Sequence, residues 1–199
     1  MDTSASSIFT ESEKEQGFTL LELLVVMSIT VALAAMVLGY SRESSNQLAL
    51  ASTESKILSL INRAKFLSIE TYFGGGRSGD QRICAYGVKV DTFKREMFIF
   101  QDLSSTGNCP GDSDGSYTES YSKNQDERLY GELNEVKLEN TALTFGETDL
   151  EEVIFIPPDP QTKINNSDAT KEAKVSVKLK EGNGQFVITV NKYGQIKAQ

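Results

Sequence analysis

Histidine is absent from this chain of 199 residues, and cysteine and proline are scarce. Without histidine, the chain can form no Ser-His or Cys-His nucleophile pair, and it lacks the commonest zinc ligand. We therefore expect no enzyme, no metal site and no cofactor. The four prolines all lie at or after Pro110, so no proline interrupts the first half of the chain.

Positive charge is also in deficit. The chain has 20 lysines and arginines against 28 aspartates and glutamates, which gives a formal net charge of −8. Such a protein has no general electrostatic attraction to nucleic acid or to anionic lipid. The composition therefore argues against a dedicated nucleic-acid-binding protein.

One long apolar run stands out near the N-terminus. Residues 18–40 comprise 23 residues with a single charged side chain, Glu22. About 20 helical residues cross the ~30 Å hydrocarbon core of a bilayer, because each residue adds about 1.5 Å. The run predicts a transmembrane helix over 18–40; the alternative is a buried helix of a soluble domain. Glu22 lies about one turn into it, so its carboxylate could simply reach the headgroups.

The start of this run carries a family resemblance. Gly17, Phe18, Thr19, Leu20, Leu21 and Glu22, followed by unbroken apolar sequence, resemble the prepilin signature of type IV pilins and type II secretion pseudopilins. The resemblance implies that residues 1–17 are a leader removed by a prepilin peptidase, and that the new terminal residue, Phe18, is N-methylated. It also implies that Glu22 pairs with the terminal amine of a neighbouring subunit during assembly. It covers residues 17 to about 40.

The same resemblance implies a location and partners. It places the protein in the inner (cytoplasmic) membrane as a single-pass protein with a cytoplasmic N-terminus and an extracytoplasmic C-terminal domain. Its partners would be other pilins or pseudopilins, the prepilin peptidase and the inner-membrane assembly platform. The assembled form would be a periplasmic or surface filament.

After the apolar run, residues 41–73 predict an amphipathic continuation of the helix. No glycine occurs between Gly39 and Gly74, and Ile57, Leu60, Ile61, Ala64 and Leu67 fall on one helical face. The alternative is a separate helix after a break near 41–46. Residues 74–79 are rich in glycine and predict the turn that ends the helix.

Residues 74–199 predict a β-rich extracytoplasmic domain. The pattern predicts a hairpin at 82–100 and later strands at 129–138, 141–145, 153–156, 173–180, 186–190 and 193–197. The segments 104–125 and 157–170 predict loops, and residues 181–184 predict a tight hairpin turn. The expected fold class is α+β, with a long N-terminal helix packed on an antiparallel β-sheet.

Cys84 and Cys109 are the only thiols. One lies on a predicted strand and the other in a predicted loop, which suits a disulfide in an extracytoplasmic domain; the alternative is two free thiols. Residues 112–115 predict an acidic solvated loop. They do not fit an EF-hand, because Pro110 and Tyr121 would occupy its first and last positions. The alternative is a calcium-holding loop, as the resemblance to secretion pseudopilins allows. The glycosylation sequon at 165–167 is interpreted as chance.

Two function classes remain. The favoured one is a pilin-like structural subunit of a type II secretion or type IV pilus filament, and the sheet-rich domain with a disulfide loop resembles the H-type minor pseudopilins most. The alternative is a single-span membrane protein whose β domain binds an extracellular ligand or partner, such as DNA for uptake.

Overall fold

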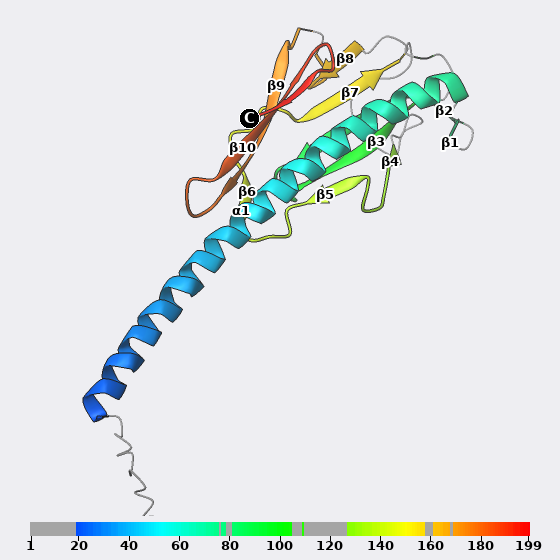
Figure 1. Ribbon diagram of the computed structural model, residues 1–199. Coiled ribbons are helices and arrows are strands. Elements are labelled where there is room, and N and C mark those ends of the chain that lie inside the picture. The colour runs from blue at the N-terminus through cyan, green and yellow to red at the C-terminus, as the bar shows by residue number, and fades with distance from the viewer. Residues whose placement is uncertain are drawn as a thin grey trace, which may run out of the picture. The chain divides into compact units, whose positions relative to one another are not determined.

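The computed structural model describes residues 19–75, 77–78, 81–104, 109, 127–157, 161–167 and 169–199. The chain divides into two units, Met1–Glu43 and Ser44–Gln199. The architecture is α+β: one long N-terminal helix is followed by antiparallel β-sheets, as predicted (Figure 1).

The helix α1 comprises Leu20–Gly74 and continues through residues 41–46 without interruption. The break considered near these residues is therefore not present. The helix ends at a glycine, as expected. Gly75 has φ +63°, and its N–H donates to the carbonyl of Thr71 at 2.9 Å. This left-handed conformation is the usual helix stop and is least costly for glycine.

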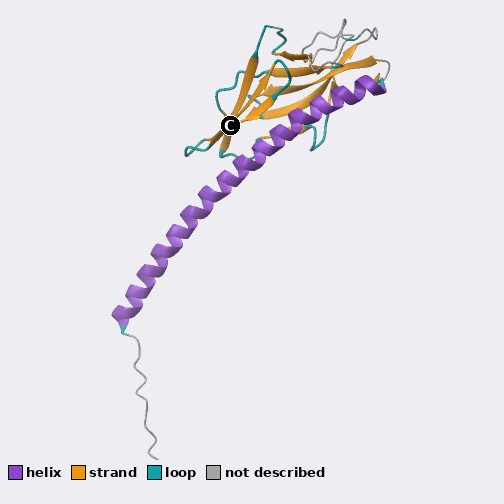
Figure 2. Ribbon diagram, turned by 45° about the horizontal axis from the view of Figure 1, so that its top comes forward, coloured by secondary structure: helices purple, strands orange, loops and turns teal. Residues whose placement is uncertain are grey.

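In the second unit, the part of α1 from Ser44 onward packs its apolar face on the β domain (Figure 2). Five residues were predicted to share that face. Ile57, Leu60, Ile61 and Ala64 are buried, and Leu67 is partly buried against the core. Two polar contacts also fasten the helix. The Ser68 hydroxyl donates to the carbonyl of Phe155, and the Lys65 ammonium donates to the carbonyl of Gly194 at 3.0 Å.

Two antiparallel sheets are present instead of the single sheet that the strand pattern predicted. The first has seven strands in the order β4-β3-β2-β7-β8, with β1 beside β2 and β5 beside β3. Its strands are β1 (Arg77–Ser78), β2 (Gln81–Asp91), β3 (Glu96–Ser104), β4 (Glu127–Arg128), β5 (Glu135–Lys137), β7 (Glu152–Ile156) and β8 (Gln161–Ile164).

The second sheet has four strands in the order β11-β10-β9-β6. They are β6 (Leu143–Phe145), β9 (Glu172–Leu179), β10 (Gln185–Asn191) and β11 (Ile196–Ala198). The predicted hairpin turn between β9 and β10 is confirmed, and Gly182 supplies the positive φ of +97° that it needs. One continuous core joins apolar side chains of α1 to both sheets.

The side of the seven-stranded sheet that faces away from the main core carries a smaller buried cluster, formed by Ala85, Phe98, Phe100, Ile154 and Ile156. Gly87 belongs to the same face. A Cβ at Gly87 would lie 2.4 Å from the Phe100 ring and 2.9 Å from Ile154, so the phenyl ring lies against the bare backbone. The glycine is therefore required by a close approach and not by a turn.

Two strand predictions, one loop and one turn were wrong in detail. The strand predicted at 193–197 is Ile196–Ala198, after a turn in which Gly194 has φ +67°. Residues 129–138 were predicted as one strand, but only Glu135–Lys137 is extended there. Gly131 has φ +116°, and the Asn134 N–H donates to its carbonyl, which makes a turn where strand was expected. The predicted loop 157–170 contains β8, and the predicted turn 74–79 contains the two-residue β1. Sequence pattern missed both because short strands are stabilised mainly by their pairing partners.

Candidate membrane anchor and assembly motif

Of the prepilin-like signature, the structure describes Thr19 to Glu22. Leu20, Leu21 and Glu22 belong to the first turn of α1. Thr19 precedes the first helical residue, and its hydroxyl oxygen accepts the backbone N–H of Glu22 at 3.3 Å. Its carbonyl accepts the N–H of Leu23 at 3.2 Å. Thr19 is thus the N-cap residue, and it satisfies an N–H that the helix itself leaves without a partner.

Glu22 lies three residues after the cap, the only acidic residue in the first turn, and its side chain is exposed. A carboxylate at this position interacts favourably with the positive end of the helix dipole. This capping role of Thr19 was not predicted from the sequence. The spacing Thr-x-x-Glu, which is typical of a capping box, was the available signal. Gly17 and Phe18, the predicted cleavage and methylation residues, lie outside the described residues.

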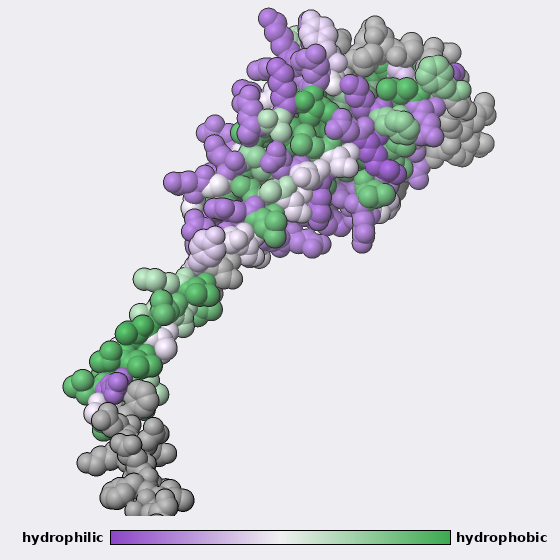
Figure 3. Space-filling model, viewed as in Figure 1, coloured by the Kyte–Doolittle hydropathy of each residue, from purple (hydrophilic) through white to green (hydrophobic). Residues whose placement is uncertain are grey.

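The helix that follows has the properties of a membrane anchor. The most apolar stretch of this helix, within Leu20–Thr71, has a mean hydropathy of 2.5, and none of that stretch is buried in the structure. Figure 3 shows mostly hydrophobic side chains along the described residues of α1 in the first unit, with a few polar ones among them. The hydroxyls of Ser28 and Thr30 donate to the carbonyls of Val25 (2.8 Å) and Met27 (2.9 Å). These hydroxyls therefore need no water as an acceptor.

The β domain contains the predicted disulfide. Cys84 and Cys109 are bonded, with Cα atoms 5.1 Å apart. The pairing of β2 with β3 shifts register between Ile83 and Ala85, as a β-bulge does. The strict alternation expected along this strand is therefore broken: Ile83 and Tyr86 both belong to the main core. The bulge places Cys84 at the irregular position of the strand.

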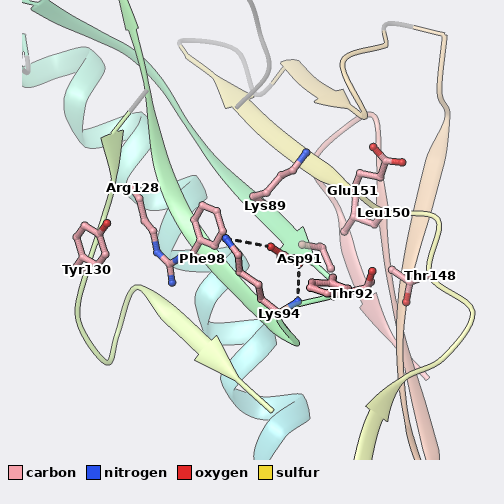
Figure 4. A pocket seen from close by; sticks show the side chains of 12 residues that line it. Lys89, Asp91, Thr92, Lys94, Phe98, Arg128, Tyr130, Thr148, Leu150 and Glu151 are labelled. Atoms are coloured by element: carbon pink, nitrogen blue, oxygen red, sulfur yellow. Dashed lines mark hydrogen bonds and ion pairs between the residues drawn. The ribbon is translucent and has the colours of Figure 1, made fainter. Parts of the chain in front are cut away.

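A groove of about 520 Å³ opens beside the β2–β3 hairpin (Figure 4). Arg128 and Tyr130 lie on one side, and Thr148, Leu150 and Glu151 lie on the other, with Phe98 and Lys89 between them. Tyr130 is 77% exposed, and Phe93 at the hairpin tip is 95% exposed. Two exposed aromatic side chains beside one groove are a common feature of binding surfaces.

Arg128 organises one wall of this groove. Its guanidinium donates to Glu96 at 2.8 and 3.1 Å and to Glu135 at 2.8 Å, and it stacks 4.1 Å above the centre of the Phe98 ring. The hydrogen bond from Arg128, with further help from Lys137, lowers the pKa of Glu135 below its ordinary value. The two glutamates raise the pKa of Arg128. The network attaches β4 and β5 to the same edge of β3.

Two other predictions concern ligands and modification. Over the described ranges, no group of three or more Cys, Asp or Glu side chains is arranged to hold a metal ion. The acidic residues 112–115 lie outside those ranges. Asn165 of the sequon adopts φ +52°, accepts the N–H groups of Glu151 and Glu152, and donates to the carbonyl of Asp149 at 2.6 Å. The side-chain amide of Asn165 is therefore hydrogen-bonded to the backbone of residues 149–152.

The N-terminal segment matches a known family. The sequence pattern of the family described as "Prokaryotic N-terminal methylation motif" matches residues 13–38. No curated protein matches the chain. The structure is similar to that of the minor pseudopilin EpsH from the Type 2 Secretion System of Vibrio cholerae, at 13% identity and a TM-score of 0.41, with 76% of this chain and 92% of that chain covered.

The motif, at residues 13–38, overlaps the first part of the exposed apolar helix, which begins at Leu20. Together they fit a membrane-anchored protein with a prokaryotic N-terminal methylation motif.

Proposed function

We propose that this protein is a minor pseudopilin, a structural subunit of a short filament in type II secretion or a related type IV pilus system. The observation that carries the proposal is the methylation motif at residues 13–38, located at the start of an exposed apolar helix whose one charged residue from 18 to 40 is Glu22. An oxidised β domain with two antiparallel sheets follows this helix. That combination suits an extracytoplasmic structural subunit.

Glu22 provides the assembly step in this proposal. Cleavage after Gly17 leaves the amine of Phe18 at the end of an apolar segment, where an unpaired ammonium is costly. The carboxylate of Glu22 on a neighbouring subunit neutralises that amine, and each charge becomes tolerable in lipid because the other is present. Assembly thus requires the prepilin peptidase first, then the membrane platform and the other pilins.

Intact-mass measurement tests the proposal most directly. The protein is produced in a host with a prepilin peptidase and extracted from the membrane. The expected mass lacks residues 1–17 and carries one added methyl group. A bulky residue in Gly17→Leu should block processing, whereas Gly39→Ala, at a glycine with nothing within 4 Å of its would-be Cβ, should not. Filament material that still carries Met1–Gly17 would contradict the proposal.

A second candidate function has one observation in its favour. The groove flanked by Arg128 and Tyr130, with the exposed Phe93 at its edge, could serve a membrane-anchored domain that binds an extracellular partner. The two candidates differ in one measurable respect. A binding domain keeps its function when Glu22 is replaced, provided that the chain still inserts into the membrane, whereas a filament subunit does not.

A further inference from the structure

Charge is distributed unevenly along this chain. Its 20 lysines and arginines and 28 aspartates and glutamates give −8 overall, but residues 171–199 contain six lysines and two glutamates, which is +4. The residues before them therefore carry −12. The positive segment forms most of the second sheet, namely β9, β10 and β11. An asymmetry of this kind is typical of proteins that bind nucleic acid or a membrane surface.

Four lysines of this segment lie on one face of the second sheet. Side chains two residues apart on a strand share a face, so Lys174 and Lys178 of β9, with Lys180 directly after it, lie together. Thr189 is paired with both Lys174 and Lys197, so Lys197 of β11 shares that face. All four lysines are exposed, and they are here called the lysine face.

The protein itself neutralises the lysine face only weakly. Over the described residues, every lysine of the face except Lys174 lacks an ion pair. Lys174 lies 3.9 Å from Glu172, and both side chains are exposed, so this pair contributes little. The carboxylate of Asp149 accepts the backbone N–H of Lys174. Glu181 is the only other acidic residue of the positive segment. The face therefore keeps most of its charge for an external partner.

One end of the lysine face is attached close to the predicted membrane span. The turn between β9 and β10 packs on α1 (Figure 1), and a Cβ at Gly184 would lie 3.3 Å from the side chain of Leu50. Leu50 follows Tyr40, the last residue of the apolar run, by ten residues. Because a helix rises about 1.5 Å per residue, the hairpin that carries Lys178 and Lys180 is attached within about 15 Å of the end of that run.

We propose that the lysine face, beginning at its hairpin end, docks on the anionic phospholipid headgroups of the membrane in which α1 is anchored. Each lysine beside an anionic bilayer strengthens binding roughly fivefold. The anchor also keeps that surface within reach of the β domain, which raises its effective concentration. No soluble polyanion has this advantage. The contact rests on the proposed function in one respect, namely that α1 spans the membrane and the β domain lies outside it.

Headgroups suit this face better than a protein partner does. In the described strands, the residues that share the face include no aromatic side chain and no arginine. Those residue types are enriched in protein interfaces, whereas lysine is depleted there. Lysine is a compact charge on a flexible stem, so several lysines can reach phosphates that have no fixed arrangement.

Headgroup quenching in vesicles tests the contact. The full-length chain carries a fluorophore at Asn183→Cys, an exposed position in the β9–β10 turn, and its native disulfide stays oxidised. The vesicles contain phosphatidylcholine alone or an equal mixture with phosphatidylglycerol, each with a lipid that carries a quencher on its headgroup. Quenching reports the ratio of docked to undocked domains, which should be higher with phosphatidylglycerol. Raising the ionic strength from about 0.1 M to about 1 M should abolish that difference, because the Debye length falls from ~10 Å to ~3 Å.

Two double variants locate the contact. Lys178→Gln/Lys180→Gln should lower the docked ratio in phosphatidylglycerol vesicles about 25-fold, roughly fivefold for each lysine. Lys171→Gln/Lys192→Gln is the matched control. It removes the same charge at the other end of β9 and β10, where the Lys192 N–H donates to the carbonyl of Lys171 at 2.9 Å. That end is about 30 Å of strand away from Lys180 and beyond the Debye length, so the ratio should change less than about twofold.

Equal quenching in the two kinds of vesicle, or an equal loss in the two double variants, would overturn the inference. Lysine-dependent binding of a short DNA duplex, without any effect of phosphatidylglycerol on quenching, would also overturn it. Resistance of the chain to carbonate extraction and its N-terminal processing are measured on the membranes from which it is purified. An inserted and processed chain that does not dock contradicts only this contact, whereas a chain that carbonate extracts contradicts the proposed function.

Discussion

The backbone N–H of Glu22 donates to the hydroxyl of Thr19, so the motif that resembles a processing signal also caps its own helix. Threonine and serine can both accept this bond, whereas alanine cannot. The two residues therefore have roles in the single chain, before any contact with another subunit.

Thr19→Ala should fray the first turn of α1. Loss of an N-cap typically costs about 1 kcal/mol, or roughly a fivefold change in an opening equilibrium. Hydrogen exchange of the detergent-solubilised chain should show the amide of Glu22 exchanging about fivefold faster. Thr19→Ser is the control and should exchange like the wild type. Equal exchange in all three proteins would mean that the cap contributes nothing.

Replacement of Glu22 separates an interfacial carboxylate from one that pairs between subunits. Glu22→Leu should insert into the membrane and be cleaved normally, but it should no longer co-purify with partner pilins. Breaking one side of a buried ion pair costs about 3–5 kcal/mol, which is roughly two to four decades in an assembly equilibrium. Assembly of Glu22→Leu at wild-type levels would return Glu22 to the headgroup interface.

Gly87→Ala tests the close approach of Phe100 to the backbone of β2. The added methyl group would lie 2.4 Å from the ring, and both Phe100 and Ile154 are fully buried. Overpacking of this kind typically costs about 1–3 kcal/mol. Denaturant unfolding should show that loss, while Gly39→Ala should leave the unfolding of the β domain unchanged. An unchanged midpoint for Gly87→Ala would show that the ring can move aside without cost.

The Cys84–Cys109 disulfide should contribute to the stability of the β domain. A cross-link with a sequence separation of 25 typically stabilises by about 3 kcal/mol. The double variant Cys84→Ser/Cys109→Ser should lose about that much in denaturant unfolding, and mass mapping without reductant should find the bond in extracytoplasmic wild-type protein. Quantitative alkylation of both thiols in that material, without prior reduction, would contradict the bond.

The Arg128–Glu135 pair predicts a dependence of stability on pH. The pKa of Glu135 is lowered in the folded protein, first by the hydrogen bond from Arg128. The stabilisation is therefore complete above the ordinary pKa of 4.5 and is lost as the pH falls through the lowered folded value. Between pH 6 and pH 3, Glu135→Gln should lose less free energy of unfolding than the wild type. Glu139→Gln, at an exposed carboxylate on the same segment, should behave like the wild type.

Local pattern was sufficient to predict the long helix, its apolar and amphipathic parts, and the two long hairpins. The reason is that helical periodicity and tight turns depend on residues close together in the sequence. The 3.6-residue period placed Ile57, Leu60, Ile61 and Ala64 in the core, and glycine marked the end of the helix at Gly75. The spacing of Thr19 and Glu22 likewise encodes the helix cap, because both residues lie within one turn.

Only the tertiary structure decided how the strands divide into two sheets, and where the short ones lie. The strands β1, β4 and β8 have little pattern of their own and depend on hydrogen bonds to β2, β3 and β7. Arg128 is an ordinary charged residue in the sequence, and Glu96, its partner, lies 32 positions away. Such long-range pairings depend on which strands meet, and no local period along the chain encodes that choice.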